Sequence, residues 1–162
     1  AIGVLIGLWF YTRKWPGQPY LWILDRVAVA AALGGCLIRL GNLFNSEILG
    51  RPTQVPWAFV FERVDLVPRH PAQLYESLAY AVIFVGLLLL YRRLRASTPH
   101  GLLIGIFLIT VFLSRFLIEF TKEEQAAYVK ELPLTVGQWL SIPFIIAGAV
   151  LFARAMRRQG GR

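Results

Sequence analysis

The chain has 162 residues, of which 57% are hydrophobic, and its mean hydropathy is +0.59. This composition is typical of an integral membrane domain and argues against a soluble one, whose apolar runs are interrupted more often. The formal net charge of +8 alone would suit a nucleic-acid-binding protein. A phosphate-binding face would lack the acidic residues found here, however, and no RNA- or DNA-binding motif is present, so no nucleic-acid partner is expected.

Four apolar stretches are each long enough to cross a bilayer, which takes roughly 20 residues of helix for a core of about 30 Å. They cover residues 21–40, 71–91, 101–120 and 134–153. A fifth stretch, residues 1–12, is too short to cross alone and does not begin with Met. We expect it to be the rear half of a helix whose upstream residues are missing. The predicted fold is all-α: a polytopic transmembrane helical bundle of four full spans plus a truncated N-terminal one, forming a single membrane domain over residues 1–162.

Basic residues fall in alternate connections between the apolar stretches, which is the positive-inside pattern. The residues concerned are Arg13, Lys14, Arg26, Arg92, Arg93, Arg95, Arg154, Arg157, Arg158 and Arg162. All acidic residues except Asp25 lie in or beside the opposite connections. The pattern predicts that the basic connections face the cytoplasm. Residues 43–70 then form an extracytoplasmic connection, which we expect to carry part of a functional site.

Cys36 is the only cysteine, so no disulfide can form within the chain. It lies deep in the second stretch, and no cation flanks it to favour a thiolate, so we expect a packing role rather than a nucleophilic one. The sequence has no metal-ligand spacing, no phosphate-cradling glycine loop and no serine elbow. No metal site and no cofactor are therefore predicted.

Polar residues cluster where the second stretch ends. Arg39 and Asn42 are three residues apart, so they share one face if the helix continues, and Asn45 or Ser46 extends that face by a turn. Alternatively, Arg39 reaches the headgroups alone and Asn42 caps the helix end. Because polar groups are costly in lipid, the cluster as a whole favours a site that faces a cavity.

A second pair, Arg115 and Glu119, lies four residues apart near the outer end of the fourth stretch. A salt bridge on one helical face would offset the cost of burying both charges. Its role is either structural or functional. In the functional interpretation Glu119 orients Arg115, whose planar guanidinium binds phosphate oxygens through two parallel hydrogen bonds and stays charged at any relevant pH.

The third stretch begins with several polar residues. Pro71 suits the first turn of a helix, where Gln73 and Glu76 place acceptors and negative charge near the positive end of the helix dipole. His70 is a candidate general base, but one imidazole at a helix entrance is more often a structural hydrogen-bonding residue. Composition and spacing thus predict an outward-facing site for an anionic headgroup.

Four segments resemble, in the same order, the motifs of prolipoprotein diacylglyceryl transferases. They are IRLGNLFNSEILGR at residues 38–51, RHPAQLYE at 69–76, SRFLIEF at 114–120 and LTVGQWLSIP at 134–143. The resemblance covers nearly the whole chain. It implies transfer of the sn-1,2-diacylglyceryl group from phosphatidylglycerol to the lipobox cysteine of a prolipoprotein, at the extracytoplasmic side of the bacterial cytoplasmic (inner) membrane.

The resemblance also implies site residues. The catalytic set is Arg39, Asn42, Glu47, Arg115 and Glu119. Within it, Arg39 and Arg115 would bind the lipid phosphate, Asn42 would bind the headgroup, and Glu47 and Glu119 would hold the arginines. The supporting set is Gly50, expected in a backbone turn, with Asn45, His70, Gln73, Tyr75 and Glu76.

One departure from the family pattern is serious. The family's His-Gly-Gly segment, whose histidine is the proposed thiol base, is not found, and residues 1–4 look like its continuation. An upstream tyrosine that the family uses is also not found. We expect the chain to be a truncated copy that is inactive alone. A transporter or channel, and a purely structural membrane subunit, are the rival interpretations.

Overall fold

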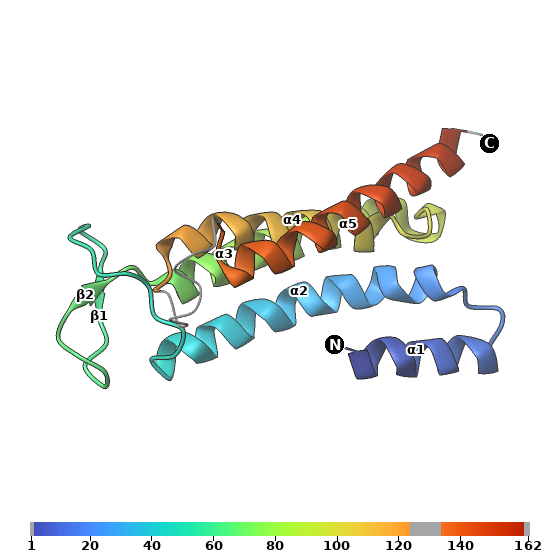
Figure 1. Cartoon of the computed structure of the whole chain (residues 1–162). Helices are drawn as coiled ribbons and strands as arrows, with labels where there is room; N and C mark the ends of the chain where they lie inside the picture. The colour runs from blue at the N-terminus through green and yellow to red at the C-terminus, as the bar shows by residue number, and fades with distance from the viewer. Residues whose placement is uncertain (1, 124–133, 161–162) are drawn as a thin grey trace.

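The computed structural model describes residues 2–123 and 134–160, and its helices run side by side (Figure 1). The helical elements are α1 (Ile2–Lys14), α2 (Tyr20–Phe44), α3 (Ala72–Leu94), η1 (Arg95–Ser97), α4 (Leu102–Ile118), η2 (Glu119–Thr121) and α5 (Val136–Gly160). Two short strands, β1 (Phe59–Val60) and β2 (Pro68–Arg69), pair antiparallel between α2 and α3. The four long helices α2, α3, α4 and α5 are each long and apolar enough to cross a membrane. This confirms the all-α class and the four predicted spans.

The helices pack in a bundle in which glycines allow α4 and α5 to approach closely. Helix α2 packs mainly on α3 and α4 mainly on α5, while α4 also contacts α2 and α3. At the α4–α5 crossing, a Cβ on Gly105 would lie 2.8 Å from the Phe152 nitrogen, and one on Gly148 would lie 2.8 Å from the Gly105 oxygen. Close backbone approach through glycine is a common way for helices to associate in lipid. Helix α1 contributes no buried residue and contacts α2 at the edge of the bundle.

The contacts of Asp25 explain why this one acidic residue lies outside the acidic connections. Its side chain is buried in α2, and its two carboxylate oxygens accept hydrogen bonds from the backbone nitrogens of Gly101 at 2.7 Å and Ile104 at 2.9 Å. These amides belong to the first turn of α4, where donors have no partner within the helix. Asp25 therefore caps α4 from a neighbouring helix and fixes that helix against α2.

At the opposite end of the bundle, three segments that are distant in sequence are held together by backbone hydrogen bonds. The Arg51 nitrogen donates to the Thr121 oxygen at 2.8 Å, and the His70 nitrogen donates to the Arg51 oxygen at 3.0 Å. Gly50 and Lys122 also form an isolated antiparallel bridge. The chain after α2, the entrance to α3 and the exit of α4 are thus joined directly, beside the strands at this end (Figure 1).

Candidate active site

Arg39 lies in the last two turns of α2 and is bound by two neighbours. Its Nε is 3.0 Å from Oε2 of Glu76 on α3, and its Nη1 donates to Oδ1 of Asn42 at 3.4 Å. The predicted shared face of Arg39 and Asn42 is therefore present. The carboxylate against Arg39 belongs to Glu76, however, and not to Glu47 as the family resemblance led us to expect.

Asn42 does not cap α2, because the helix continues to Phe44 and Asn45 is the capping residue. The Nδ2 of Asn42 donates instead to Oε2 of Glu47 at 2.7 Å. The Glu47 backbone oxygen in turn accepts a hydrogen bond of 2.6 Å from Nε2 of Gln73. Glu47 thus positions Asn42 through its carboxylate and is itself tied to α3 through its carbonyl.

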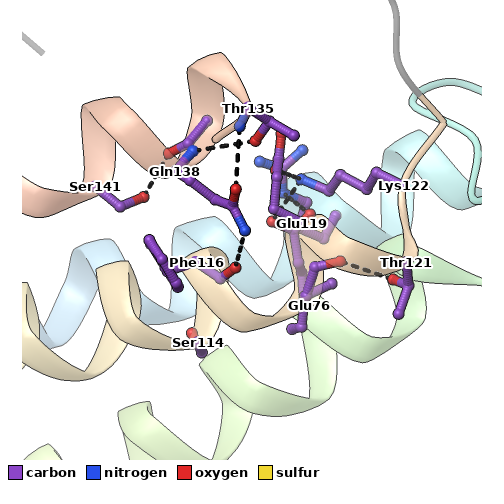
Figure 2. Close-up of polar contacts among 12 residues, drawn as sticks. Glu76, Ser114, Phe116, Glu119, Thr121, Lys122, Thr135, Gln138 and Ser141 are labelled. Carbon is purple, nitrogen blue, oxygen red and sulfur yellow. Dashed lines mark hydrogen bonds and ion pairs between the residues drawn. The ribbon is translucent and has the colours of Figure 1, made fainter. Parts of the chain in front are cut away.

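Lys122 is a site residue that the sequence did not indicate. Its Nζ lies 3.1 Å from Oε1 of Glu76 and 3.2 Å from Oε2 of Glu119 (Figure 2). With Arg39, these residues form a chain of alternating charge that joins α2, α3 and the end of α4. The Glu76 side chain is fully buried and that of Lys122 is 8% exposed, so each charge depends on the next one for compensation.

The expected ion pair between Arg115 and Glu119 is not formed. The α-helix ends at Ile118, and Glu119 begins the 3-10 turn η2, in which its carboxylate pairs with Lys122 three residues later. Within residues 2–123 and 134–160, Arg115 forms no ion pair with a carboxylate. Glu119 is therefore bound to Lys122 and not to Arg115.

The start of α5 closes the site from the other side. A Cβ on Gly137 would overlap the Glu119 carboxylate, so only glycine leaves room for Glu119 in its observed place. The next residue, Gln138, is held at both ends of its amide: Oε1 accepts from the Thr135 nitrogen at 3.0 Å, and Nε2 donates to the Phe116 oxygen at 3.4 Å (Figure 2). The fourth motif thus places a glycine against Glu119 and, next to it, a glutamine that binds the end of α4.

His70 and Tyr75 form a hydrogen-bonded group at the edge of the site. The Tyr75 hydroxyl accepts from Nε1 of Trp57 at 2.8 Å and lies 3.2 Å from Nδ1 of His70. The direction of the contact between Tyr75 and His70 depends on the tautomer of the imidazole. The geometry suits a structural histidine, which was the favoured interpretation of the sequence.

The first motif segment, residues 38–51, is called the signature segment below. Its turn is made by residues other than Gly50. Ser46 and Ile48 have φ of 58° and 56°, in the left-handed region that is costly for a β-branched residue. Gly50 is extended in its bridge with Lys122, and the need for glycine is one of space, because a Cβ there would overlap the carbonyl oxygen of His70. The expectation of a turn at Gly50 is wrong for this reason.

Comparison with known proteins points to one family. The family model described as "Prolipoprotein diacylglyceryl transferase" matches residues 1–154. The chain is 53% identical to the phosphatidylglycerol–prolipoprotein diacylglyceryl transferase of Chloroherpeton thalassium, 52% to that of Tolumonas auensis and 48% to that of Bacteroides fragilis. These alignments cover 98%, 98% and 91% of the chain, but 59%, 61% and 53% of the relatives.

The chain thus spans somewhat more than half the length of the curated relatives it matches. The family match extends across all four motif segments and across the residues that the structure brings together at one end of the bundle. The chain therefore belongs to the prolipoprotein diacylglyceryl transferase family.

Proposed function

We propose that the complete protein containing this chain transfers the diacylglyceryl group of phosphatidylglycerol to the lipobox cysteine of prolipoproteins. A sulfur–carbon bond forms as the bond between the glyceryl carbon and the phosphate oxygen breaks, and glycerol 1-phosphate leaves. The observation that carries this proposal is the buried chain of charges at one end of the bundle, in which Arg39 and Lys122 are held by carboxylates from neighbouring elements. Fixed cationic donors of this kind stabilise negative charge as it develops on a departing phosphate.

The residue contacts support distinct roles. Arg39 is fixed by Glu76 and Asn42, so its guanidinium is held in place before a lipid arrives. Arg115 forms no carboxylate ion pair in the described part of the chain, which leaves its charge for the lipid phosphate. Asn42 binds the headgroup, and Glu119 acts on the site through Lys122. Preorganised charges of this kind cost no rearrangement during the reaction.

The nucleophile in this proposal arrives with the prolipoprotein. Cys36, the chain's own cysteine, is buried, and its Sγ lies 3.2 Å from the Ser77 hydroxyl. The same hydroxyl donates to the Cys36 backbone oxygen at 3.0 Å, which ties α2 to α3 in the bundle core. Cys36 therefore has a packing role, as its position in the sequence suggested.

The proposed location is the bacterial inner membrane, with the site facing outward. In support, the basic ends of α1, α3 and α5 lie at the end of the bundle away from the strands (Figure 1). Positive residues mark the cytoplasmic side of membrane proteins. Labelling of single cysteines introduced at Arg93 and Glu62 tests the orientation: we expect only the second to react with an impermeant reagent added outside intact cells.

The decisive experiment is Arg39→Lys in the complete protein, with Arg92→Lys at the basic end as the matched control. Transfer from labelled phosphatidylglycerol to a lipobox peptide is measured with purified protein. We expect Arg39→Lys to insert and fold but to lose most transfer activity, because a point charge cannot reproduce the planar guanidinium. Equal turnover by the two lysine variants would remove Arg39 from the site. A transporter or structural subunit would show no transfer at all.

The thiol base is proposed to lie outside residues 1–162, since the family's His-Gly-Gly segment is not found in them. The purified chain 1–162 should then be inactive, and His70→Ala in the complete protein should retain substantial activity. Robust transfer by the chain alone, abolished by His70→Ala, would move the base to His70.

A further inference from the structure

Gln73 has a buried amide with only one of its two ends satisfied. The side chain is fully buried on α3, and its Nε2 donates to the Glu47 backbone oxygen at 2.6 Å. Its Oε1 has no hydrogen-bond partner among residues 2–123 and 134–160. Such an acceptor is unusual, because the large majority of buried side-chain polar atoms are paired, and leaving one unpaired costs about 1–3 kcal/mol.

The orientation of this amide is fixed by the signature segment. Because Nε2 is committed to the Glu47 carbonyl, the amide cannot be turned over without losing that hydrogen bond. Oε1 is therefore held as an acceptor. By contrast, Gln138 is also buried and has partners at both ends of its amide. Burial of glutamine in this fold thus does not by itself leave an oxygen unpaired.

Gln73 lies one helical turn from Glu76, the residue that pairs with Arg39. Gln73 and Glu76 are three residues apart on α3, so they share a helical face. Oε2 of Glu76 is within ion-pair distance of Arg39 but has no aligned hydrogen bond. One face of α3 therefore carries the unpaired oxygen of Gln73 and, one turn away, the carboxylate that pairs with an arginine proposed to bind phosphate.

We propose that Oε1 of Gln73 accepts a hydrogen bond from a hydroxyl group of the lipid's glycerol headgroup, which makes Gln73 a determinant of headgroup selectivity. This inference rests on the proposed function. The headgroup carries two hydroxyl groups within a few bonds of its phosphate, so a phosphate near Arg39 brings a donor toward α3. A site built around a hydroxyl disfavours a ligand without one, because its buried acceptor is then left unpaired. The oxygen is buried, so a headgroup hydroxyl reaches it only when a neighbouring side chain moves.

The test compares two donor lipids with identical acyl chains in the complete protein: phosphatidylglycerol and phosphatidylpropanol. They share a phosphodiester charge and a three-carbon headgroup, and differ in the hydroxyls. The measured quantity is the ratio of kcat/KM for the two lipids in transfer to a lipobox peptide. The variants are Gln73→Met, which keeps the side-chain length but removes the acceptor, and Gln73→Leu, which removes the acceptor with a shorter apolar side chain. Gln138→Met is the control for loss of a buried glutamine.

We expect the wild type to prefer phosphatidylglycerol and Gln73→Met to lower that ratio by about 2- to 13-fold, the range for one neutral hydrogen bond. Gln138→Met should keep the preference even where total turnover falls. A wild type without preference, a Gln73→Met ratio equal to wild type, or an equal change in Gln138→Met would overturn the inference. If Gln73→Met does not fold, Gln73→Leu decides in its place, and a ratio equal to wild type would then overturn the inference. Absence of transfer from either lipid by the wild type would instead refute the proposed function, and the inference with it.

Discussion

Gly50→Ala is the substitution whose consequence follows most directly from the structure. The added Cβ would overlap the His70 carbonyl oxygen and lie 2.8 Å from the His70 Cβ. Neither side can yield easily. The His70 oxygen accepts a hydrogen bond from the Ala72 nitrogen at 2.9 Å, and the Gly50 oxygen accepts one from Nη1 of Arg69 at 3.3 Å. The added methyl group must therefore push two bonded backbone segments apart.

The size of the effect can be bounded from these contacts. Overpacking a tight contact costs about 1–3 kcal/mol. Losing one of the flanking hydrogen bonds adds about 1 kcal/mol. The free energy of unfolding should thus fall by roughly 2–4 kcal/mol. The control is Gly41→Ala, because Gly41 lies inside α2 with nothing within 4 Å of its Cβ position. In a helix interior that change should stabilise by about 0.5–1 kcal/mol.

The assay is the apparent Tm of the complete protein in detergent. At roughly 2–4 °C per kcal/mol, Gly50→Ala should melt about 4–16 °C below wild type, and Gly41→Ala at or slightly above it. Equal melting temperatures for the two alanine variants would show that the signature segment moves away from His70 without cost. In that case the proposed rigidity of this end of the bundle would be wrong.

Three further predictions concern charge and space near the same end. Gly137→Ala should reduce transfer activity with little change in apparent Tm, because its Cβ meets the end of the Glu119 side chain rather than backbone; a large fall in Tm would contradict this. Lys122→Met should lower kcat/KM by about tenfold or more, since removing one partner of a buried ion pair leaves the other charges uncompensated. Lys122→Arg, which keeps the positive charge, should retain much of the activity. A methionine variant as active as wild type would exclude Lys122 from the site. Arg69 beside Asp65 holds the pKa of that carboxyl below its ordinary value of 3.8. This pair therefore stabilises the fold above that value and ceases to do so as the pH falls further. Asp65→Asn should flatten the dependence of Tm on pH below about 4, and an unchanged dependence of Tm on pH in that range would count against the pair.

The helices could be predicted from the sequence because a membrane span depends mainly on the composition of one continuous segment. A run of about twenty mostly apolar residues has few alternatives in lipid, and all four predicted spans form helices. Spacing also predicted the shared face of Arg39 and Asn42, because three residues along a helix bring side chains together. The end of α2 was predicted four residues early: the helix continues past Leu40 to Phe44, and Asn42 in this last part donates a hydrogen bond to Glu47.

The ion-pair partners at the site could not be predicted from the sequence, because they depend on where α4 ends. The spacing of Arg115 and Glu119 would have paired them in a continuous helix. The change to a 3-10 turn after Ile118 gives Glu119 to Lys122 instead. Nothing in a single sequence marks that change, and a lysine after a span resembles any interfacial cation. The unpaired oxygen of Gln73 was likewise hidden, since it follows from which backbone carbonyl the other end of the amide meets.

The two arginines of the site therefore differ in kind under the proposed function. Arg39 is compensated by Glu76 at 3.0 Å, so it adds little net charge and contributes a donor of fixed direction. Arg115 has no such carboxylate among the described residues, so it supplies the excess positive charge that attracts an anion. A site with two uncompensated arginines would repel itself when empty, and one with two compensated arginines would attract a phosphate weakly. One of each gives a stable empty site that still favours binding of a singly charged phosphodiester.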